Sequence, residues 1–121
     1  MNAALLVALG GALGALARYG CVTLAARAFG GGFPLGTLLV NALGCCVAGL
    51  VAAWLEARGD SVELRAFLAV GVLGGFTTFS AFGVDTLALV RDGRTLVACV
   101  YVATSLVCGL GGVALGLRLA R

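Results

Sequence analysis

The sequence predicts an all-α integral membrane protein with four spanning helices, the third of them broken within the membrane. Of its 121 residues, 62% are hydrophobic and 11% are charged, whereas soluble domains are about 45–50% apolar. A spanning helix needs roughly 20 residues, because each residue rises about 1.5 Å through the hydrocarbon core. The chain therefore has room for four such helices with short loops, and we expect residues 1–121 to form one membrane domain.

The first helix is expected over residues 2–28, and it carries an arginine within its apolar run. Gly10 and Gly14 lie four positions apart, a spacing that lets another helix approach closely. Arg18 is costly in a membrane unless it snorkels to an interface, pairs with an acid or faces water. The neighbouring Tyr19 fits snorkelling, whereas a water-filled vestibule would use the charge to attract an anion. Both interpretations stay open at this point.

The second helix is expected over residues 35–57, after a turn at residues 29–36 that contains the only proline. Its two prominent polar residues, Thr37 and Asn41, are four positions apart and so share one face. An asparagine in a membrane helix either bonds to a neighbouring helix or lines a pore with its amide. The spacing does not distinguish these two roles.

The third helix is expected over residues 64–90, with an interruption near its middle. The adjacent pair Gly74–Gly75 weakens it, because each glycine costs about 1 kcal/mol relative to alanine in a helix. The hydroxyls of Thr77, Thr78 and Ser80 can then bond the backbone groups that a break releases. Interrupted membrane helices are where transporters place ion sites, because broken ends present carbonyl and amide dipoles.

Two further features follow the expected break. Phe79 and Phe82 are three positions apart and share a face. They either pack ordinarily or turn their ring edges, which are the positive part of the ring quadrupole, toward a small anion. Asp85 is an acid within the membrane, and therefore a functional candidate. Its alternative role is as an ion-pair partner of Arg18 or Arg91.

The fourth helix is expected over residues 95–119 and carries one polar stripe. Tyr101, Thr104, Ser105 and Cys108 follow the spacing i, i+3, i+4, i+7, which places them on one side of a helix. The polar groups within the membrane are thus mainly neutral hydrogen-bond donors. Donors without a titrating relay favour passive transport of an anion, with selectivity set by pore width and lining groups.

Composition excludes several other classes of protein. The basic residues are all arginines scattered along the chain, so the basic patch that nucleic-acid binding requires is missing. The five cysteines lack metal-binding spacing and are expected to be small apolar residues rather than a zinc site or disulfide framework. Nucleophilic catalysis would require a base near Ser80, and none is visible. We therefore do not expect an enzyme.

The arginines also bear on orientation in the membrane. With four spans, both termini and the loop at residues 56–65 lie on one side of the membrane. The positive-inside rule depends on differences in arginine and lysine between the two sides, and here the difference is almost nil. We therefore expect insertion in both orientations and an antiparallel homodimer. The first side carries Arg58, Arg65, Arg118 and Arg121, and the second carries Arg27, Arg91 and Arg94.

Three motifs together resemble those of the Fluc or CrcB family of small membrane fluoride channels, and the resemblance spans the whole chain. They are GALARY at residues 14–19, GTLLVNALG at residues 36–44 and GGFTTFSAF at residues 74–82. The resemblance implies a passive, selective channel in the inner (plasma) membrane that exports fluoride and limits its toxicity in the cytoplasm. It also implies a dual-topology antiparallel homodimer with two pores. The rival is a small proton-coupled multidrug exporter, for which Asp85 would be the required carboxylate.

The resemblance also assigns residues. It implies a structural sodium at the dimer centre, held by the main-chain carbonyls of Gly74 and Thr77, and no organic cofactor. Two positions depart from the family pattern: Ala81 stands where threonine is usual, and Asp85 where glutamate is common. The pore would be lined by Thr37, Asn41, Phe79, Ser80, Phe82, Tyr101 and Ser105, with Arg18 and Asp85 in the vestibule.

Overall fold

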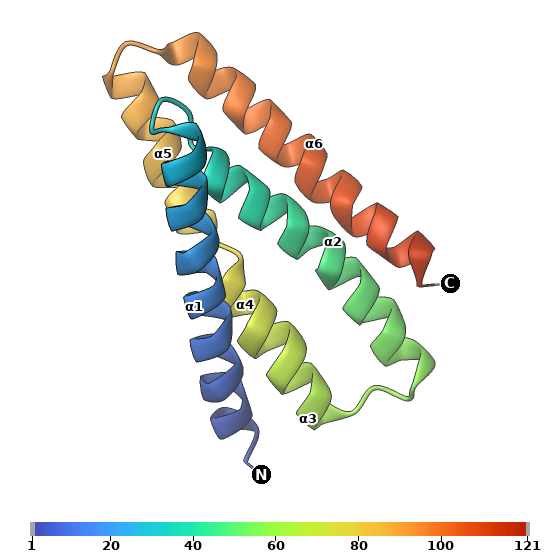
Figure 1. Ribbon diagram of the computed structural model, residues 1–121. Coiled ribbons are helices and arrows are strands. Elements are labelled where there is room, and N and C mark those ends of the chain that lie inside the picture. Colours follow the sequence, from blue (N-terminus) through green and yellow to red (C-terminus); the bar gives the residue numbers. More distant parts are fainter. Residues whose placement is uncertain (1, 121) are drawn as a thin grey trace.

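The computed structural model describes residues 2–120, and the regular structure in that part of the chain is helical. Four stretches are long and apolar enough to cross a membrane, which confirms the predicted four spanning helices (Figure 1). The third span is composed of several segments. The bounds are Ala3–Phe29 (α1), Leu35–Ala57 (α2), Val62–Leu64 (α3), Arg65–Leu73 (η1, a π-helix), Gly74–Phe76 (α4), Phe79–Arg91 (α5) and Thr95–Leu119 (α6).

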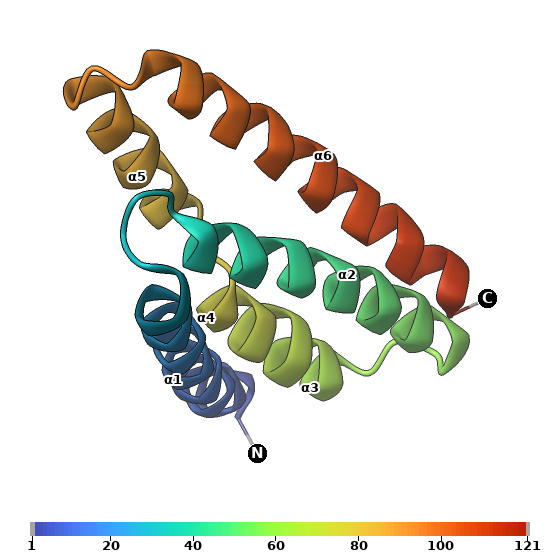
Figure 2. The same cartoon turned by 45° about the horizontal axis from the view of Figure 1, so that its top comes forward.

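The spans pack as two close pairs. Helix α2 runs along α6, and α1 runs along η1 and α4 (Figures 1 and 2). Glycines form both contacts. A Cβ added to Gly14 would lie 2.8 Å from the backbone nitrogen of Phe76, and one added to Gly116 would lie 2.8 Å from that of Leu50. The predicted close approach of a helix at Gly14 is therefore confirmed, and its partner is the third span.

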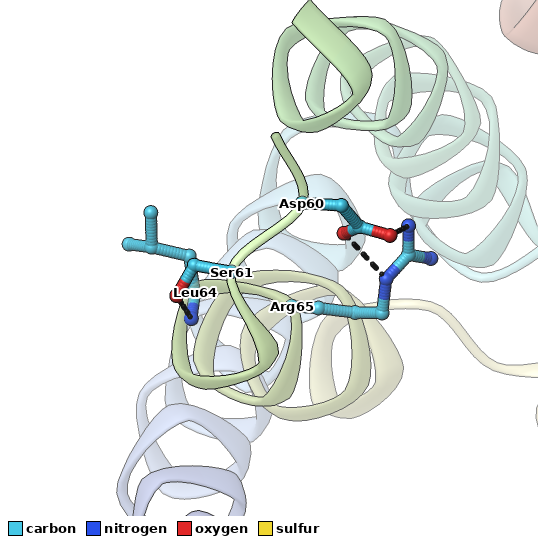
Figure 3. Close-up of polar contacts among 4 residues, drawn as sticks. All are labelled: Asp60, Ser61, Leu64 and Arg65. Carbon is cyan, nitrogen blue, oxygen red and sulfur yellow. Dashed lines mark hydrogen bonds and ion pairs between the residues drawn. The ribbon is translucent and has the colours of Figure 1, made fainter. Parts of the chain in front are cut away.

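The loop between α2 and α3 is a tight, exposed turn. Gly59 and Asp60 adopt positive φ angles of 83° and 50°. Ser61 caps α3 by accepting a hydrogen bond from the Leu64 amide at 3.4 Å, and the Arg65 guanidinium donates to both oxygens of Asp60 at 2.7 and 2.9 Å (Figure 3). This ion pair joins the loop to the start of the third span. Because both side chains are about half exposed, the pair adds little to the stability of the fold.

The interruption of the third span lies beyond the two glycines. Thr77 and Thr78 are extended, with φ/ψ of −79°/156° and −152°/115°, whereas α4 begins at Gly74 in helical conformation. A Cβ added to Gly75 would lie 3.1 Å from the Ala15 nitrogen, so Gly75 is needed for packing against α1. A break was correctly predicted, but attributing it to the glycines was wrong, because β-branched threonines favour extended backbone.

Substitution of Gly14 tests the packing of α1 against the third span. We expect Gly14→Ala to lower stability by about 1–3 kcal/mol, the usual penalty for overpacking, because the added methyl meets the backbone of Val72 and Phe76. The measurement is thermal unfolding in detergent. The matched control is Gly20→Ala, where a Cβ meets nothing within 4 Å. It should be neutral or raise stability by up to about 1 kcal/mol through helix propensity. Equal behaviour of the two variants would contradict the packing argument.

Candidate functional site

The interruption is held together by one side chain from α2. The Asn41 amide nitrogen donates to the Thr78 carbonyl at 2.9 Å, and the Thr78 amide donates to the Asn41 amide oxygen at 2.8 Å. Backbone groups inside a membrane need such partners, because hydrocarbon provides none. Asn41 therefore bonds two helices together, which is one of the two roles that its sequence position left open.

Two threonine hydroxyls add hydrogen bonds on either side of the interruption. Thr77 Oγ1 donates to the Leu73 carbonyl at 2.8 Å, and Thr78 Oγ1 accepts from the Ala81 amide at 3.1 Å, which caps α5. Thr78 Oγ1 also lies 3.2 Å from the Ser80 hydroxyl. The prediction that these hydroxyls bond backbone groups released by the break is confirmed for Thr78. The Leu73 carbonyl that Thr77 Oγ1 bonds already accepts from the Thr77 amide at 2.9 Å, so it is not a released group.

A cavity of about 240 Å³ opens beside the interruption, between α2, α5 and α6; it is called the break cavity below. The hydroxyl oxygen of Ser105 is fully buried and has no hydrogen-bond partner among residues 2–120. Buried polar atoms are normally paired, so this hydroxyl indicates a place for a small polar ligand or water. The lining residues are Asn41, Cys45, Thr77, Thr78, Phe79, Phe82, Ser105, Leu106 and Gly109.

Aromatic rings extend from the break cavity toward the loop between α1 and α2. The Phe79 and Phe82 centroids are 5.4 Å apart, Phe82 and Tyr101 are also 5.4 Å apart, and Phe33 meets Tyr101 edge-on at 5.5 Å. Phe79 is 82% exposed, whereas Tyr101 is fully buried. Phe82 therefore connects the open end of this row of rings to its buried end.

Asp85 accepts hydrogen bonds from hydroxyl groups and pairs with neither predicted arginine. Its Oδ2 accepts from Thr37 at 2.7 Å and from Tyr101 at 3.5 Å. Within residues 2–120 the one ion pair joins Asp60 and Arg65, so the alternative in which Asp85 pairs with Arg18 or Arg91 is wrong. Two hydroxyl protons are thereby directed at a carboxylate within the membrane span.

Arg18 reaches the interruption. Its guanidinium lies 3.5 Å from the Thr77 carbonyl oxygen, as a long hydrogen bond. A second cavity of about 430 Å³, called the arginine cavity below, is lined by Arg18, Thr37, Asp85 and Thr78 among others. Thr78 also lines the break cavity, so the two cavities meet at that residue. The guanidinium is thus directed at the broken backbone.

The residues expected to form a site are thus divided between the two cavities. Asn41, Phe79, Phe82 and Ser105 line the break cavity; Thr37 joins Arg18 and Asp85 in the arginine cavity. Tyr101 contacts Asp85, and Ser80 contacts Thr78 while lining neither cavity.

Gly74 and Thr77 line a third cavity of about 290 Å³, which also contains Cys45 and Arg65. Cys45 therefore belongs to two cavities, since it also lines the break cavity. Sequence reasoning did not assign it a role. Its spacing of four positions from Asn41 was the available signal, because residues four apart share a helix face.

A family profile described as "CrcB-like protein, Camphor Resistance (CrcB)" matches residues 5–117. The chain belongs to the CrcB family. Three relatives are named fluoride-specific ion channel FluC. The protein of Hyphomonas neptunium is 49% identical over 123 residues, covering 100% of this chain and 97% of its own length. The Paracoccus denitrificans protein is 53% identical, covering 95% and 91% respectively. The Thermus thermophilus protein is 51% identical, covering 98% and 95%.

Membership in the CrcB family agrees with the four apolar spans. Together these two observations make the chain a multi-pass membrane protein. The motifs from which the resemblance was inferred, at residues 14–19, 36–44 and 74–82, all lie inside the matched range.

Replacement of Asn41 tests how the interruption is held. We expect Asn41→Ala to lower stability by about 1–3 kcal/mol, because it leaves the buried Thr78 amide and carbonyl without partners. Exchange of the Thr78 amide hydrogen should become faster at the same time. The measurements are unfolding in detergent and residue-resolved hydrogen exchange. Ser105→Ala is the control: it removes a hydroxyl without a partner, so stability should be unchanged. A stable Asn41→Ala protein with a protected Thr78 amide would contradict the assignment.

Proposed function

We propose that this CrcB-family chain is a passive, selective fluoride channel that lets fluoride leave the cytoplasm across the inner (plasma) membrane and so reduces its toxicity. The observation that carries the proposal is the break cavity, where Asn41, the partnerless Ser105 hydroxyl and two phenylalanines meet beside interrupted backbone. The three relatives with about half of their residues identical are named as fluoride channels, which supports the same function.

The physical task is to replace the water around a strongly hydrated anion without trapping it. Asn41 uses one amide hydrogen on Thr78 and keeps the second for a ligand. The Ser105 hydroxyl provides another donor, and the ring edges of Phe79 and Phe82 provide weak positive potential. These groups are neutral, so they attract the ion less strongly than a full charge would. Arg18, in the arginine cavity, raises the local anion concentration.

Thr37 and Tyr101 differ from Asn41 and Ser105 because their hydroxyl protons are already hydrogen-bonded to a carboxylate. Both hydroxyls face the Asp85 carboxylate, so a passing anion has to compete with Asp85 for their protons. A proton-coupled exporter would also use Asp85, but the named relatives are channels, and that rival is not favoured. Ser80 remains a candidate pore hydroxyl through its contact with Thr78.

We further infer that two copies associate as an antiparallel homodimer. Phe79 is 82% exposed and Ser80 is exposed, although both flank interrupted backbone within a membrane span. Such backbone is tolerated at membrane depth only where protein or a polar cavity covers it. A second copy over this face would provide the cover and complete the walls of the break cavity.

The same association would create a cation site at the dimer centre. The Thr78 amide donates to Asn41, so the Gly74 carbonyl lacks its usual helical donor. The Thr77 carbonyl accepts one long bond from Arg18. Both residues line one cavity, and carbonyl oxygens suit a hard cation such as sodium. We therefore propose that Gly74 and Thr77 of the two copies hold a structural sodium, with no organic cofactor.

Efflux from liposomes tests the channel function. With a potassium shunt, we expect fast release of fluoride and no release of chloride. Phe82→Ile and Asn41→Asp should each lower fluoride efflux by at least about tenfold, because they change groups at a narrow, ion-lining position. Phe29→Ile is the matched control, since Phe29 ends α1 and lies outside the break cavity. Absence of fluoride efflux from a verified dimer would overturn the function, and full efflux from Phe82→Ile would remove that ring from the pathway.

Orientation in the membrane is testable separately. Both ends of the described chain and the 58–61 loop lie at one end of the molecule, opposite the loops at 30–34 and 92–94 (Figure 1). We expect a tag on the N-terminus to be accessible from each side of the membrane in about half of the molecules, because the arginine bias is small. As control, Ala120→Arg should shift this distribution. A single orientation for the natural chain would exclude the antiparallel homodimer.

A further inference from the structure

We propose that Cys45 is a binding site for soft, thiol-seeking metal electrophiles, of which an organomercury group is the type, and that its occupation closes the ion path. Cys45 lines the break cavity together with Asn41, Phe79, Phe82 and Ser105. The second half of the proposal rests on the proposed fluoride transport; the binding itself does not.

The position of the sulfur supports this assignment. A Cβ added to Gly109 of α6 would lie 3.7 Å from Cys45 Sγ, and Gly109 lines the same cavity. Since glycine has no side chain, α6 places no side-chain atom against the sulfur at position 109. Cys45 also lines the cavity that contains Gly74 and Thr77. A group attached to the sulfur would therefore lie between the break cavity and the neighbouring cavity.

The Ser105 hydroxyl is the independent observation. Its oxygen is fully buried, lines the break cavity and has no hydrogen-bond partner among residues 2–120. Such an atom indicates a ligand or water at this place. Within the described residues no group of three His, Cys, Asp or Glu side chains converges. The site therefore suits a metal group that needs one strong sulfur ligand, because soft thiolates select soft metals.

The reaction is a ligand exchange. With methylmercury chloride, the S–H bond of Cys45 and the Hg–Cl bond break, and an S–Hg bond forms. A proton and a chloride ion leave, and no electron is transferred. The thiolate is the reacting form. Cys21 and Cys99, by contrast, are exposed and line none of the three cavities around the break.

Single-cysteine proteins test the proposal. One variant keeps Cys45 and the other keeps Cys46, with the remaining cysteines replaced by alanine. Cys46 is the matched control, because it is the next residue and lines none of the three cavities around the break. Each reconstituted protein is treated with methylmercury chloride. Mass spectrometry then measures the adduct, and efflux measures fluoride release, before and after removal of the adduct with excess dithiothreitol.

We expect the Cys45 protein to form one adduct and lose fluoride efflux by about tenfold or more, because a pore constriction is filled, with recovery after dithiothreitol. The Cys46 protein should keep its efflux when labelled. The proposal is overturned if Cys45 resists labelling while its unfolded form reacts, if labelled Cys45 protein conducts normally, or if labelling Cys46 blocks equally. If neither the Cys45 protein nor the Cys46 protein releases fluoride before labelling, that result counts against the proposed function. The mass of the labelled Cys45 protein then tests the binding site by itself.

Discussion

A chain that leaves the helical conformation inside hydrocarbon must find a partner for each released backbone group, and here Asn41 meets much of that requirement. Its amide pairs with both the N–H and the C=O of Thr78. Thr77 and Thr78 add further local bonds through their hydroxyls. The break cavity exists because these bonds let the third span stay open beside α2.

The helices were predictable because hydropathy and length determine how many spans a membrane chain can form. The place of the break was harder to predict. Gly74 and Gly75 weaken an isolated helix, but here both residues stay helical. Gly75 packs directly on α1. The extended residues are Thr77 and Thr78. The π-helix at Arg65–Leu73 has no signature in the apolar pattern, since one extra residue per turn leaves hydropathy unchanged.

The site was predictable as a set of residues but not as an arrangement. Asn41 was expected either to join helices or to line a pore; it joins α2 to the interrupted span and also lines the break cavity. Asp85 was interpreted either as a functional acid or as a partner of an arginine, and its observed partners are Thr37 and Tyr101. Long-range pairing depends on how α2, α5 and α6 meet, and spacing within one helix carries no such information. Cys45 was overlooked for a related reason, because an apolar run does not reveal which face a cavity occupies.

The pair of hydrogen bonds between Asn41 and Thr78 has an evolutionary consequence. On the side of Thr78 it uses main-chain atoms, which are the same for every amino acid except proline. A change at position 41 therefore cannot be compensated by a change of side chain at position 78, as it could be for a pair of side chains. Covariation between these two positions should be absent despite their direct contact. Methods that infer contacts from correlated substitutions would miss the bond that holds the interrupted span together.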